Sequence, residues 1–348
     1  MEHVRVFANP PPQARELELL PFLRWVGQTA VFRLKGADSS RCRALIGGLH
    51  GNEPSGFHAL HALLRDPPRD LPCDALLVLG NVPAAVAEPA WGRRMLPGEE
   101  DMNRVWDAPG SPQRAAAAEV LDLLRAEPLE AVADLHNNTG YNPIYAVAIS
   151  DDPNRAALAR CWTHRVVRYR GQRLGTFLEQ VDPGAPGVVV ECGQAGDPEA
   201  DRRAHEGARR FLSAPSPFEA APDGLPPTEG FQSIARILIP PGVTLAFAQG
   251  PTEADLTIFP GIDRYNFCSM AIGTLLAYCS DRGRLEVIDN RGQDVTSDYL
   301  QLKDGRLFLI KKVVPVMMTT NCEVAKQDCL LYAAERVATP SNGASSAS

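Results

Sequence analysis

Five short apolar runs punctuate the first two hundred residues of the chain, and each ends near Gly, Asn, His or Glu. They are Ala44–Leu49, Ala75–Leu79, Ala131–Leu135, Ile144–Ile149 and Val188–Val190. Uniformly apolar runs of this length are typical of strands that are buried on both faces of a parallel or mixed sheet.

Helix-like patterns alternate with these runs, over Ser55–Leu64, Gln113–Leu124, Arg155–Arg165 and Pro198–Leu212. Alternation of strands with helices predicts an α/β domain with three layers. Polar residues gather where the predicted strands end, and open α/β sheets usually bind their ligands at that edge.

The pattern changes after a proline-rich passage, Ser213–Glu229. Beyond it, short runs are separated by Gly, Asp and Asn turns, as at Ala235–Ile239, Val243–Phe247, Gly273–Tyr278, Arg284–Ile288 and Leu307–Val314. This spacing predicts a small all-β domain. We therefore expect an α/β domain over residues 1–225 and a small β domain over residues 226–336. A tail over residues 337–348 has too few apolar residues to fold.

Composition narrows the class of protein. The 348 residues carry a net charge of −7, with 45% apolar and 22% charged residues, values that are ordinary for a globular protein. Because no basic stripe is present, nucleic acid is not an expected partner. We also expect no membrane partner and a cytoplasmic location, since no apolar run reaches ~18–20 residues and the start lacks a secretory signal.

The eight cysteines suggest neither a zinc ribbon nor a disulfide scaffold. None of them forms a C-x-x-C pair, and their spacing along the chain is wide. In a chain of this length they are expected to be reduced and mostly buried.

The segment Gly47–Pro54, GGLHGNEP, joins a predicted strand to a predicted helix. His50 and Glu53 lie three residues apart in this turn, so an imidazole nitrogen and a carboxylate oxygen can face one cation, and both are good zinc ligands. The same residues also suit a tight turn in which Glu53 supplies negative charge near a helix N-terminus. The pair alone does not decide between these interpretations.

Two further predicted strands end in polar residues. His136 ends one run, and Asp134, two residues earlier, faces the same side of that strand, where its carboxylate can hold the second ring nitrogen of a ligating histidine. Glu191 follows three valines directly, a costly position for a carboxylate unless it faces a cleft, a partner or a metal. Each residue also suits a structural role at a strand end.

Arginines mark the region between these strands. Arg93 and Arg94 precede a Gly- and Glu-rich loop. The motif Asp101-Met102-Asn103-Arg104 follows that loop. Arginines in such loops are most often solvated, yet a guanidinium is also the natural partner of a substrate carboxylate.

The order of these sequence motifs along the chain is more specific than any single motif. With GGLHGNEPSG, DMNRVW, ADLHNNTG and VVVECG spread in this order over residues 47–193, the chain resembles the zinc carboxypeptidase superfamily. Within it, the chain resembles the succinylglutamate desuccinylase/aspartoacylase family. The resemblance implies a zinc-carboxypeptidase-like three-layer α/β/α domain with a mixed sheet, which carries the catalysis, followed by a smaller all-β domain.

Carried over by position, the resemblance implies one Zn²⁺ per chain, bound by His50, Glu53 and His136 with one position left for water. Glu191 takes the place of the family's general base and proton shuttle.

The resemblance also assigns the arginines. Arg94 takes the place of the residue that polarises the scissile carbonyl, and Asn103 and Arg104 that of the pair that holds the substrate carboxylate. The stretch between Arg94 and Asn103 is about two residues longer than in familiar members, so Arg93 stays an alternative to Arg94.

The implied activity is that of a zinc-dependent amidohydrolase that cleaves an N-acyl amino acid, a small-molecule substrate. Three alternatives stay open: a zinc carboxypeptidase acting on peptides, an amide or ester hydrolase outside amino-acid metabolism, and a non-catalytic protein that kept the metal site. A zinc-binding module has no need of Glu191, which argues against the last. The sequence also leaves open which acyl group is cleaved and which residues of the β domain line the cleft. It leaves open the oligomeric state, and a homo-oligomer is one possibility.

Overall fold

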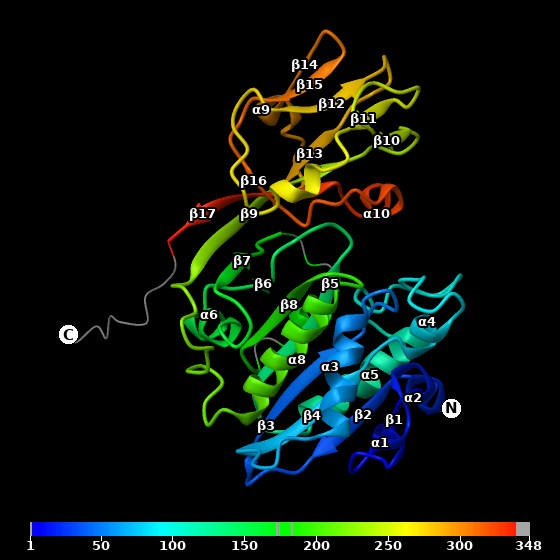
Figure 1. The fold of residues 1–348 in the computed structure, drawn as a ribbon, viewed down its shortest axis with the longest axis vertical. Coiled ribbons are helices and arrows are strands. Elements are labelled where there is room, and N and C mark those ends of the chain that lie inside the picture. The colour runs from blue at the N-terminus through cyan, green and yellow to red at the C-terminus, as the bar shows by residue number, and fades with distance from the viewer. Residues whose placement is uncertain (1, 172, 174, 182–183, 339–348) are drawn as a thin grey trace, which may run out of the picture.

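A computed structural model describes residues 2–171, 173, 175–181 and 184–338 of the chain (Figure 1). Residues 339–348 of the predicted tail lie outside the described residues.

The strands of the described residues are short, and most are mainly apolar. In chain order they are β1 (Arg5–Phe7), β2 (Ala30–Leu34), β3 (Asp38–Gly47), β4 (Cys73–Leu79), β5 (Leu129–Asn138), β6 (Tyr145–Ala148), β7 (Arg165–Arg168), β8 (Gly187–Gln194), β9 (Glu229–Leu238), β10 (Leu245–Phe247), β11 (Leu256–Ile258), β12 (Leu275–Cys279), β13 (Glu286–Asp289), β14 (Leu300–Lys303), β15 (Arg306–Leu309), β16 (Val314–Val316) and β17 (Leu331–Val337).

The helices of the described residues lie mostly in the first two thirds of the chain. They are α1 (Gln13–Glu16), α2 (Leu19–Val26), α3 (Pro54–Arg65), α4 (Val82–Val86), α5 (Pro112–Arg125), α6 (Pro153–Ala159), α7 (Phe177–Val181), α8 (Pro198–Ser213), α9 (Thr296–Tyr299) and α10 (Cys322–Gln327), with a 3₁₀ turn at Ile262–Tyr265.

One mixed sheet dominates the molecule. Within the described residues it has twelve strands, in the order β1-β2-β4-β3-β5-β8-β6-β7-β9-β17-β16, with β13 also paired to β9. The central strands β4, β3, β5 and β8 are parallel to one another, whereas β8 and β6 are antiparallel. The predicted mixed sheet is therefore confirmed.

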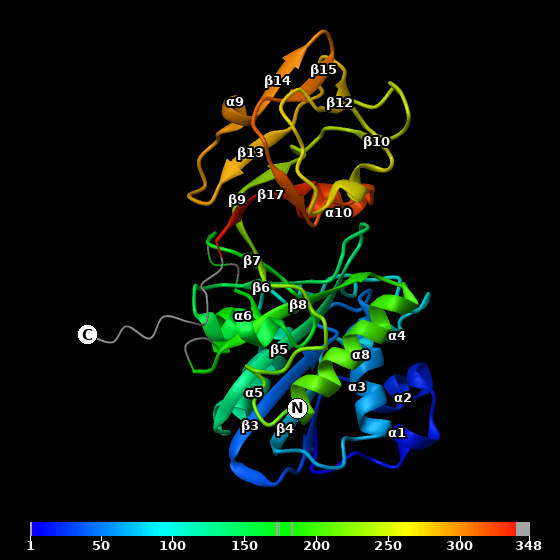
Figure 2. The same ribbon diagram turned by 60° about the vertical axis from the view of Figure 1, so that its left-hand side comes forward.

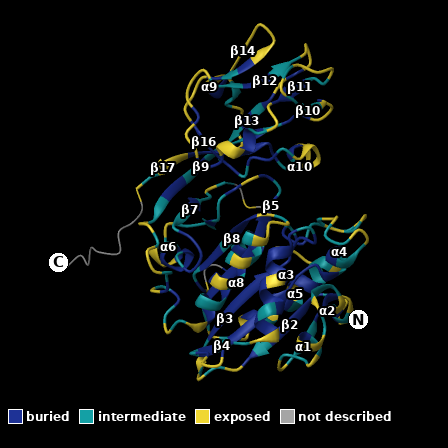
Figure 3. Ribbon diagram, viewed as in Figure 1, coloured by how far each residue is buried: buried dark blue, intermediate teal, exposed yellow. Residues whose placement is uncertain are grey.

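Helices cover both faces of this sheet, which confirms the three layers (Figures 1 and 2). Successive residues of a strand point to opposite faces, so Leu45 packs in the core beneath α2, α3 and α8, and its neighbours Ala44 and Ile46 pack in the core beneath α5 and α7. The central strands are accordingly buried on both faces (Figure 3).

Two sequence expectations about element boundaries are wrong. The predicted helix Arg155–Arg165 ends at Ala159 in α6, because the chain turns and residues from Arg165 enter the sheet as β7, between β6 and β9. The predicted run Leu307–Val314 is two strands, since β15 belongs to the second sheet and β16 pairs with β17 in the large one. Strand pairing with distant segments decides both cases.

The chain after the proline-rich passage forms a second, smaller sheet of five strands in the described residues, in the order β10-β11-β12-β15-β14. It lies beyond the β9–β17 pair in both views (Figures 1 and 2). Strands β9, β17 and β16 extend the large sheet, so the C-terminal third is joined to the α/β layers by backbone hydrogen bonds from β7 to β9.

All eight cysteines are free thiols, and five of them are buried. No helix in the described part of the chain has the length and the apolar character needed to cross a membrane.

Candidate active site

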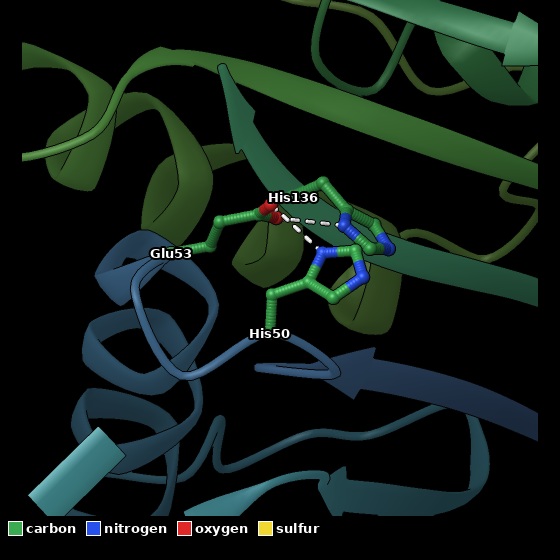
Figure 4. A group of neighbouring side chains, drawn as sticks. All are labelled: His50, Glu53 and His136. Carbon is green, nitrogen blue, oxygen red and sulfur yellow. Dashed lines mark hydrogen bonds and ion pairs between the residues drawn. The ribbon is translucent and has the colours of Figure 1, made fainter. Parts of the chain in front are cut away.

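His50, Glu53 and His136 converge at the carboxyl edge of the large sheet. One ligand atom from each lies within 4.8 Å of the others (Figure 4). The Nδ1 atom of His50 is 2.8 Å from Oε1 of Glu53, and the Nδ1 atom of His136 is 2.7 Å from Oε2 of the same carboxylate. The three side chains are buried.

Local sequence explains this convergence. Strands β3 and β5 are parallel neighbours with Gly47 opposite Leu135, so the residues that follow them meet at one edge. Helix α3 can begin close to β3 because Gly47 and Gly56 face each other; a Cβ on Gly56 would lie 2.8 Å from the Cα of Gly47. Glu53 stands directly before α3, whose first residue is Pro54, a residue that suits the first turn of a helix.

The outer ring nitrogens of both histidines face carboxylates. Nε2 of His136 is 3.0 Å from Asp134, which confirms the contact predicted from their spacing, and Nε2 of His50 is 3.0 Å from Asp101. Carboxylates in this position fix the orientation of ligating histidines.

Asp101 contacts both His50, a metal-ligand candidate, and the segment that carries Arg94 and Asn103. This role was not predicted from the sequence. Its carboxylate also accepts hydrogen bonds from Nε of Arg94, at 2.9 Å, and from the backbone N–H of Asn103, at 2.8 Å. Its place in the Asp-x-Asn-Arg word was the available signal, but the word does not show that Asp101 contacts His50.

The buried carboxylate of Glu53 is stabilised as an anion. Burial alone raises the pKa of a carboxyl group, but the charges of His50 and His136 outweigh it and hold the pKa of Glu53 well below its usual range. Burial likewise lowers the pKa of His136, and the charges of Asp134 and Glu53 reverse the effect and raise it. Without a metal, a proton on the imidazole of His136 thus helps to balance these carboxylates.

This donor set fits a zinc ion. Imidazole nitrogens and a carboxylate oxygen are the usual zinc ligands outside cysteine sites. The three donors already face one another, and both outer nitrogens have carboxylate partners. A divalent cation would supply positive charge beside the buried carboxylate of Glu53.

Glu191 lies beside this set and is not part of it. It pairs in register with His136 across β5 and β8, and its Oε2 accepts a hydrogen bond of 2.7 Å from Nδ2 of Asn138. Burial raises the pKa of Glu191 to about 8, although the charge of His136 opposes the rise. Glu191, the three metal-ligand candidates and both Arg94 and Arg104 line one cavity of about 110 Å³, which we call the catalytic cavity.

The structure separates Arg94 from Arg93. The guanidinium of Arg94 lies 3.7 Å from Glu53 and faces the catalytic cavity. Arg93 is exposed and lines instead a wider outer cavity of about 600 Å³, to which Arg94 and Arg104 also contribute. This geometry favours Arg94 over Arg93 for the carbonyl-polarising role.

Asn103 and Arg104 both line the catalytic cavity, as expected from the Asp-x-Asn-Arg word. The Oδ1 atom of Asn103 accepts a hydrogen bond from the backbone N–H of Phe177, which ties the loop to α7. Arg104 donates to the backbone oxygen of Asn103 at 2.8 Å.

The C-terminal third also lines the site, with residues that could not be named from the sequence. Residues from β17, α10 and the segments beside them reach the catalytic cavity: Met317, Val324, Asp328, Cys329 and Tyr332. They lie about 180 or more positions after His136, and no local motif marks them. Only the fold brings them to the metal-ligand candidates.

Comparison with known protein families finds a match over the region that holds His50, Glu53, His136 and Glu191. The sequence profile of the succinylglutamate desuccinylase/aspartoacylase catalytic domain matches residues 41–214, half of the chain, whereas no curated protein matches the sequence.

Solved structures share the fold at low identity. A succinylglutamate desuccinylase/aspartoacylase from Rhodobacter sphaeroides is 17% identical with a TM-score of 0.63 over 88% of each chain. A succinylglutamate desuccinylase from Chromobacterium violaceum is 19% identical with a TM-score of 0.55, over 88% of this chain and 87% of that one. Murine aminoacylase 3 is 17% identical with a TM-score of 0.54, over 87% of this chain and 97% of that one. The chain belongs to the succinylglutamate desuccinylase/aspartoacylase family of hydrolases.

Proposed function

We propose that the protein is a zinc-dependent hydrolase that cleaves the amide bond of an N-acyl amino acid. One observation carries the proposal: Glu191 and Arg104 face the same small cavity as His50, Glu53 and His136. A base, a carboxylate-binding guanidinium and a set of zinc donors within one cavity are what this hydrolysis needs.

His50, Glu53 and His136 would hold the zinc ion, which, when bound, lowers the pKa of a coordinated water from 15.7 to about 7. Glu191 takes a proton from the attacking water and returns it to the departing amine nitrogen, as a general base and then a general acid.

The arginines bind and polarise the substrate. Arg94 donates hydrogen bonds to the carbonyl oxygen as negative charge develops on it; one such donor is commonly worth ~2.7–4 kcal/mol. Arg104 and Asn103 hold the α-carboxylate and so align the amide with Glu191.

The covering of the site favours small substrates over long peptides. The catalytic cavity has a volume of about 110 Å³ and is lined on one side by Val324, Asp328 and Tyr332 of the C-terminal third. A carboxypeptidase substrate continues on the acyl side of the scissile bond, and its remaining chain would have to pass these residues. The observation supports an acylated amino acid over the carboxypeptidase alternative.

The test is an activity screen of the zinc-loaded protein against acetyl, succinyl and longer acyl derivatives of several amino acids, each with its carboxylate free or amidated. We expect release of the free amino acid from the free-acid series and little from the amidated series. Equal hydrolysis of both series would contradict the assignment of the substrate while leaving a hydrolase.

Substitution Glu191→Gln separates the base from the metal ligands. We expect a ~10²–10⁴-fold loss of kcat with the zinc content unchanged, because general base catalysis contributes about that much. Glu253→Gln, at an exposed position, is the matched control. Loss of zinc would make Glu191 a ligand, and normal turnover would exclude it as the base; both are measured by metal analysis and steady-state kinetics.

A further inference from the structure

A second pocket, of about 130 Å³, adjoins the catalytic cavity; we call it the apolar pocket. The two share a wall, made of Asn103, Arg104, Val189, Glu191, Met317 and Tyr332. A molecule bound at Arg104 and Glu191 therefore lies beside this pocket.

Three valines from neighbouring strands form the base of the apolar pocket. Val189 of β8 lies opposite Val147 of β6, and Val147 lies opposite Val167 of β7. Side chains that are paired in register lie on the same face of a sheet, and Val189 stands two residues before Glu191, on the face that bears the site. Further apolar side chains line it, namely Ile149, Leu178, Val316 and Met317, and hydroxyl groups come from Tyr169, Thr176, Ser233 and Tyr332.

The charges of the apolar pocket do not suit a second carboxylate. Among its described lining residues, Arg104 is the one cation, and Glu179 and Glu191 are acids. Glu179 accepts a hydrogen bond from the backbone N–H of Thr176 at 3.1 Å and so helps to hold its own segment. If Arg104 binds the α-carboxylate, an acidic side chain in this pocket meets apolar side chains, two acids and hydroxyl groups, and no further cation among the described lining residues.

The two ends of the proposed reaction decide which half of the substrate lies here. Glu191 gives its proton to the amine nitrogen, and Arg104 holds the α-carboxylate. The amine nitrogen and the α-carboxylate both belong to the amino-acid half of the substrate. Both residues line the apolar pocket, whereas Glu191 is not among the residues that line the outer cavity. The amino-acid side chain thus faces the apolar pocket, and the acyl group faces the outer cavity.

We propose that the apolar pocket is the specificity site for the amino-acid side chain, and that it selects a neutral aliphatic side chain over an acidic one. The inference rests on the proposed function. A volume of about 130 Å³ is that of about four water molecules at about 30 Å³ each, which suits side chains of the size of leucine, isoleucine or methionine.

The experiment is a panel of one acyl group on glycine, leucine, aspartate, glutamate and lysine. We expect kcat/KM for the leucine derivative to exceed that for each of the others by at least about tenfold, since even one methylene in an apolar pocket is worth about that much. Failure of every derivative, glycine included, would overturn the proposed function. Hydrolysis of the glycine derivative with acidic or basic side chains equal to or better than leucine would overturn this inference alone.

Ile149 lines the apolar pocket and not the catalytic cavity. Two variants of this residue test whether the apolar pocket sets the preference among amino-acid side chains. Ile149→Ala should lower the leucine-to-glycine ratio of kcat/KM severalfold, and Ile149→Arg should raise the glutamate-to-leucine ratio at least about tenfold. Ile272→Ala, at a residue that is 68% exposed, is the matched control and should change neither ratio.

Unchanged ratios in Ile149→Ala would overturn the inference, and this variant is conservative enough to stand if Ile149→Arg does not fold. A changed preference among acyl groups on glycine, with the side-chain ratios unchanged, would assign the pocket to the acyl group and also overturn it.

Discussion

The carboxyl group of Glu191 is buried at the end of β8, and burial raises its pKa to about 8 from an ordinary value of 4.5. In the metal-free folded protein this group therefore keeps its proton up to about pH 8, whereas in the unfolded chain it loses the proton near pH 4.5. Between these values the unfolded state binds fewer protons, so the stability of the metal-free protein falls as pH rises, by up to ~1.4 kcal/mol per pH unit for this group.

Glu191→Gln should remove this dependence. In the presence of a chelator, we expect the variant to be more stable than the wild type at pH 8 and nearly equal at pH 5, as measured by denaturant unfolding. The pKa of His136 is raised, so its contribution to stability is also lost as pH rises. The quantity to follow is therefore the difference in unfolding free energy between the variant and the wild type. Parallel curves across pH 5–8 would show that Glu191 ionises normally.

The carboxylate of Asp101 contacts both His50, a metal-ligand candidate, and Arg94. Burial disfavours its charge, but the hydrogen bond and the charge of His50, together with the charge of Arg94, lower the pKa of Asp101 far below its usual range. We expect Asp101→Asn to weaken zinc binding by ~10–100-fold, as is typical when the partner of a ligating histidine is altered.

Competition with a chelator measures the zinc affinity of Asp101→Asn, with Asp304→Asn, at an exposed turn, as the control. An unchanged affinity would mean that Asp101 only braces its loop.

At the scale of elements, the site depends on how closely α3 lies against β3. Gly56 contacts the backbone of Gly47, and a Cβ there would lie within 2.8 Å of it, so Gly56→Ala must displace the start of α3 and with it Glu53. We expect a loss of ~1–3 kcal/mol in the free energy of unfolding, as for other overpacked sites, together with weaker zinc binding.

Gly250→Ala is the matched control, since no atom lies within 4 Å of the Cβ that it adds. Calorimetry and metal titration follow the two effects separately. Stability that falls while zinc affinity stays at the wild-type value would show that the position of α3 does not set that of Glu53.

At the scale of the whole molecule, a small polar contact beside the site adds to the β7–β9 pairing that joins the C-terminal third to the α/β layers. The side chain of Asn266 donates to the backbone oxygens of Tyr141 and Met318 and accepts the N–H of Met318, all at 2.9 Å. Tyr141 belongs to the segment between β5 and β6, and Met318 follows Met317, which lines the catalytic cavity.

Asn266→Ala should lower the free energy of unfolding by ~1–3 kcal/mol, the cost of leaving buried polar groups without partners. It should also lower kcat/KM while zinc content stays at the wild-type level, because every proposed zinc ligand lies in the α/β layers. Asn154→Ala, at an exposed position of α6, is the control. Loss of zinc together with activity would contradict this division between binding the metal and covering it.

Much of the α/β part could be predicted because its information is local. The apolar runs around Leu45 and Val189 report burial on both faces, and α3, α5 and α8 follow from helix-like patterns that end within one or two residues of the predicted bounds. The end of α6 could not be predicted, because Arg165 enters a strand whose partners come from elsewhere in the chain.

By itself, the sequence identified His50, Glu53, His136 and Glu191 as candidates, because the motifs that contain them follow one another in the order of the family that the chain resembles. The tertiary structure alone decided that Asp101 contacts His50, that Arg94 and not Arg93 faces the cavity, and that Tyr332 covers it. The physical reason is the distance along the chain between the interacting residues. A strand end is set by the residues beside it, whereas these contacts join segments that only the packed sheet brings together.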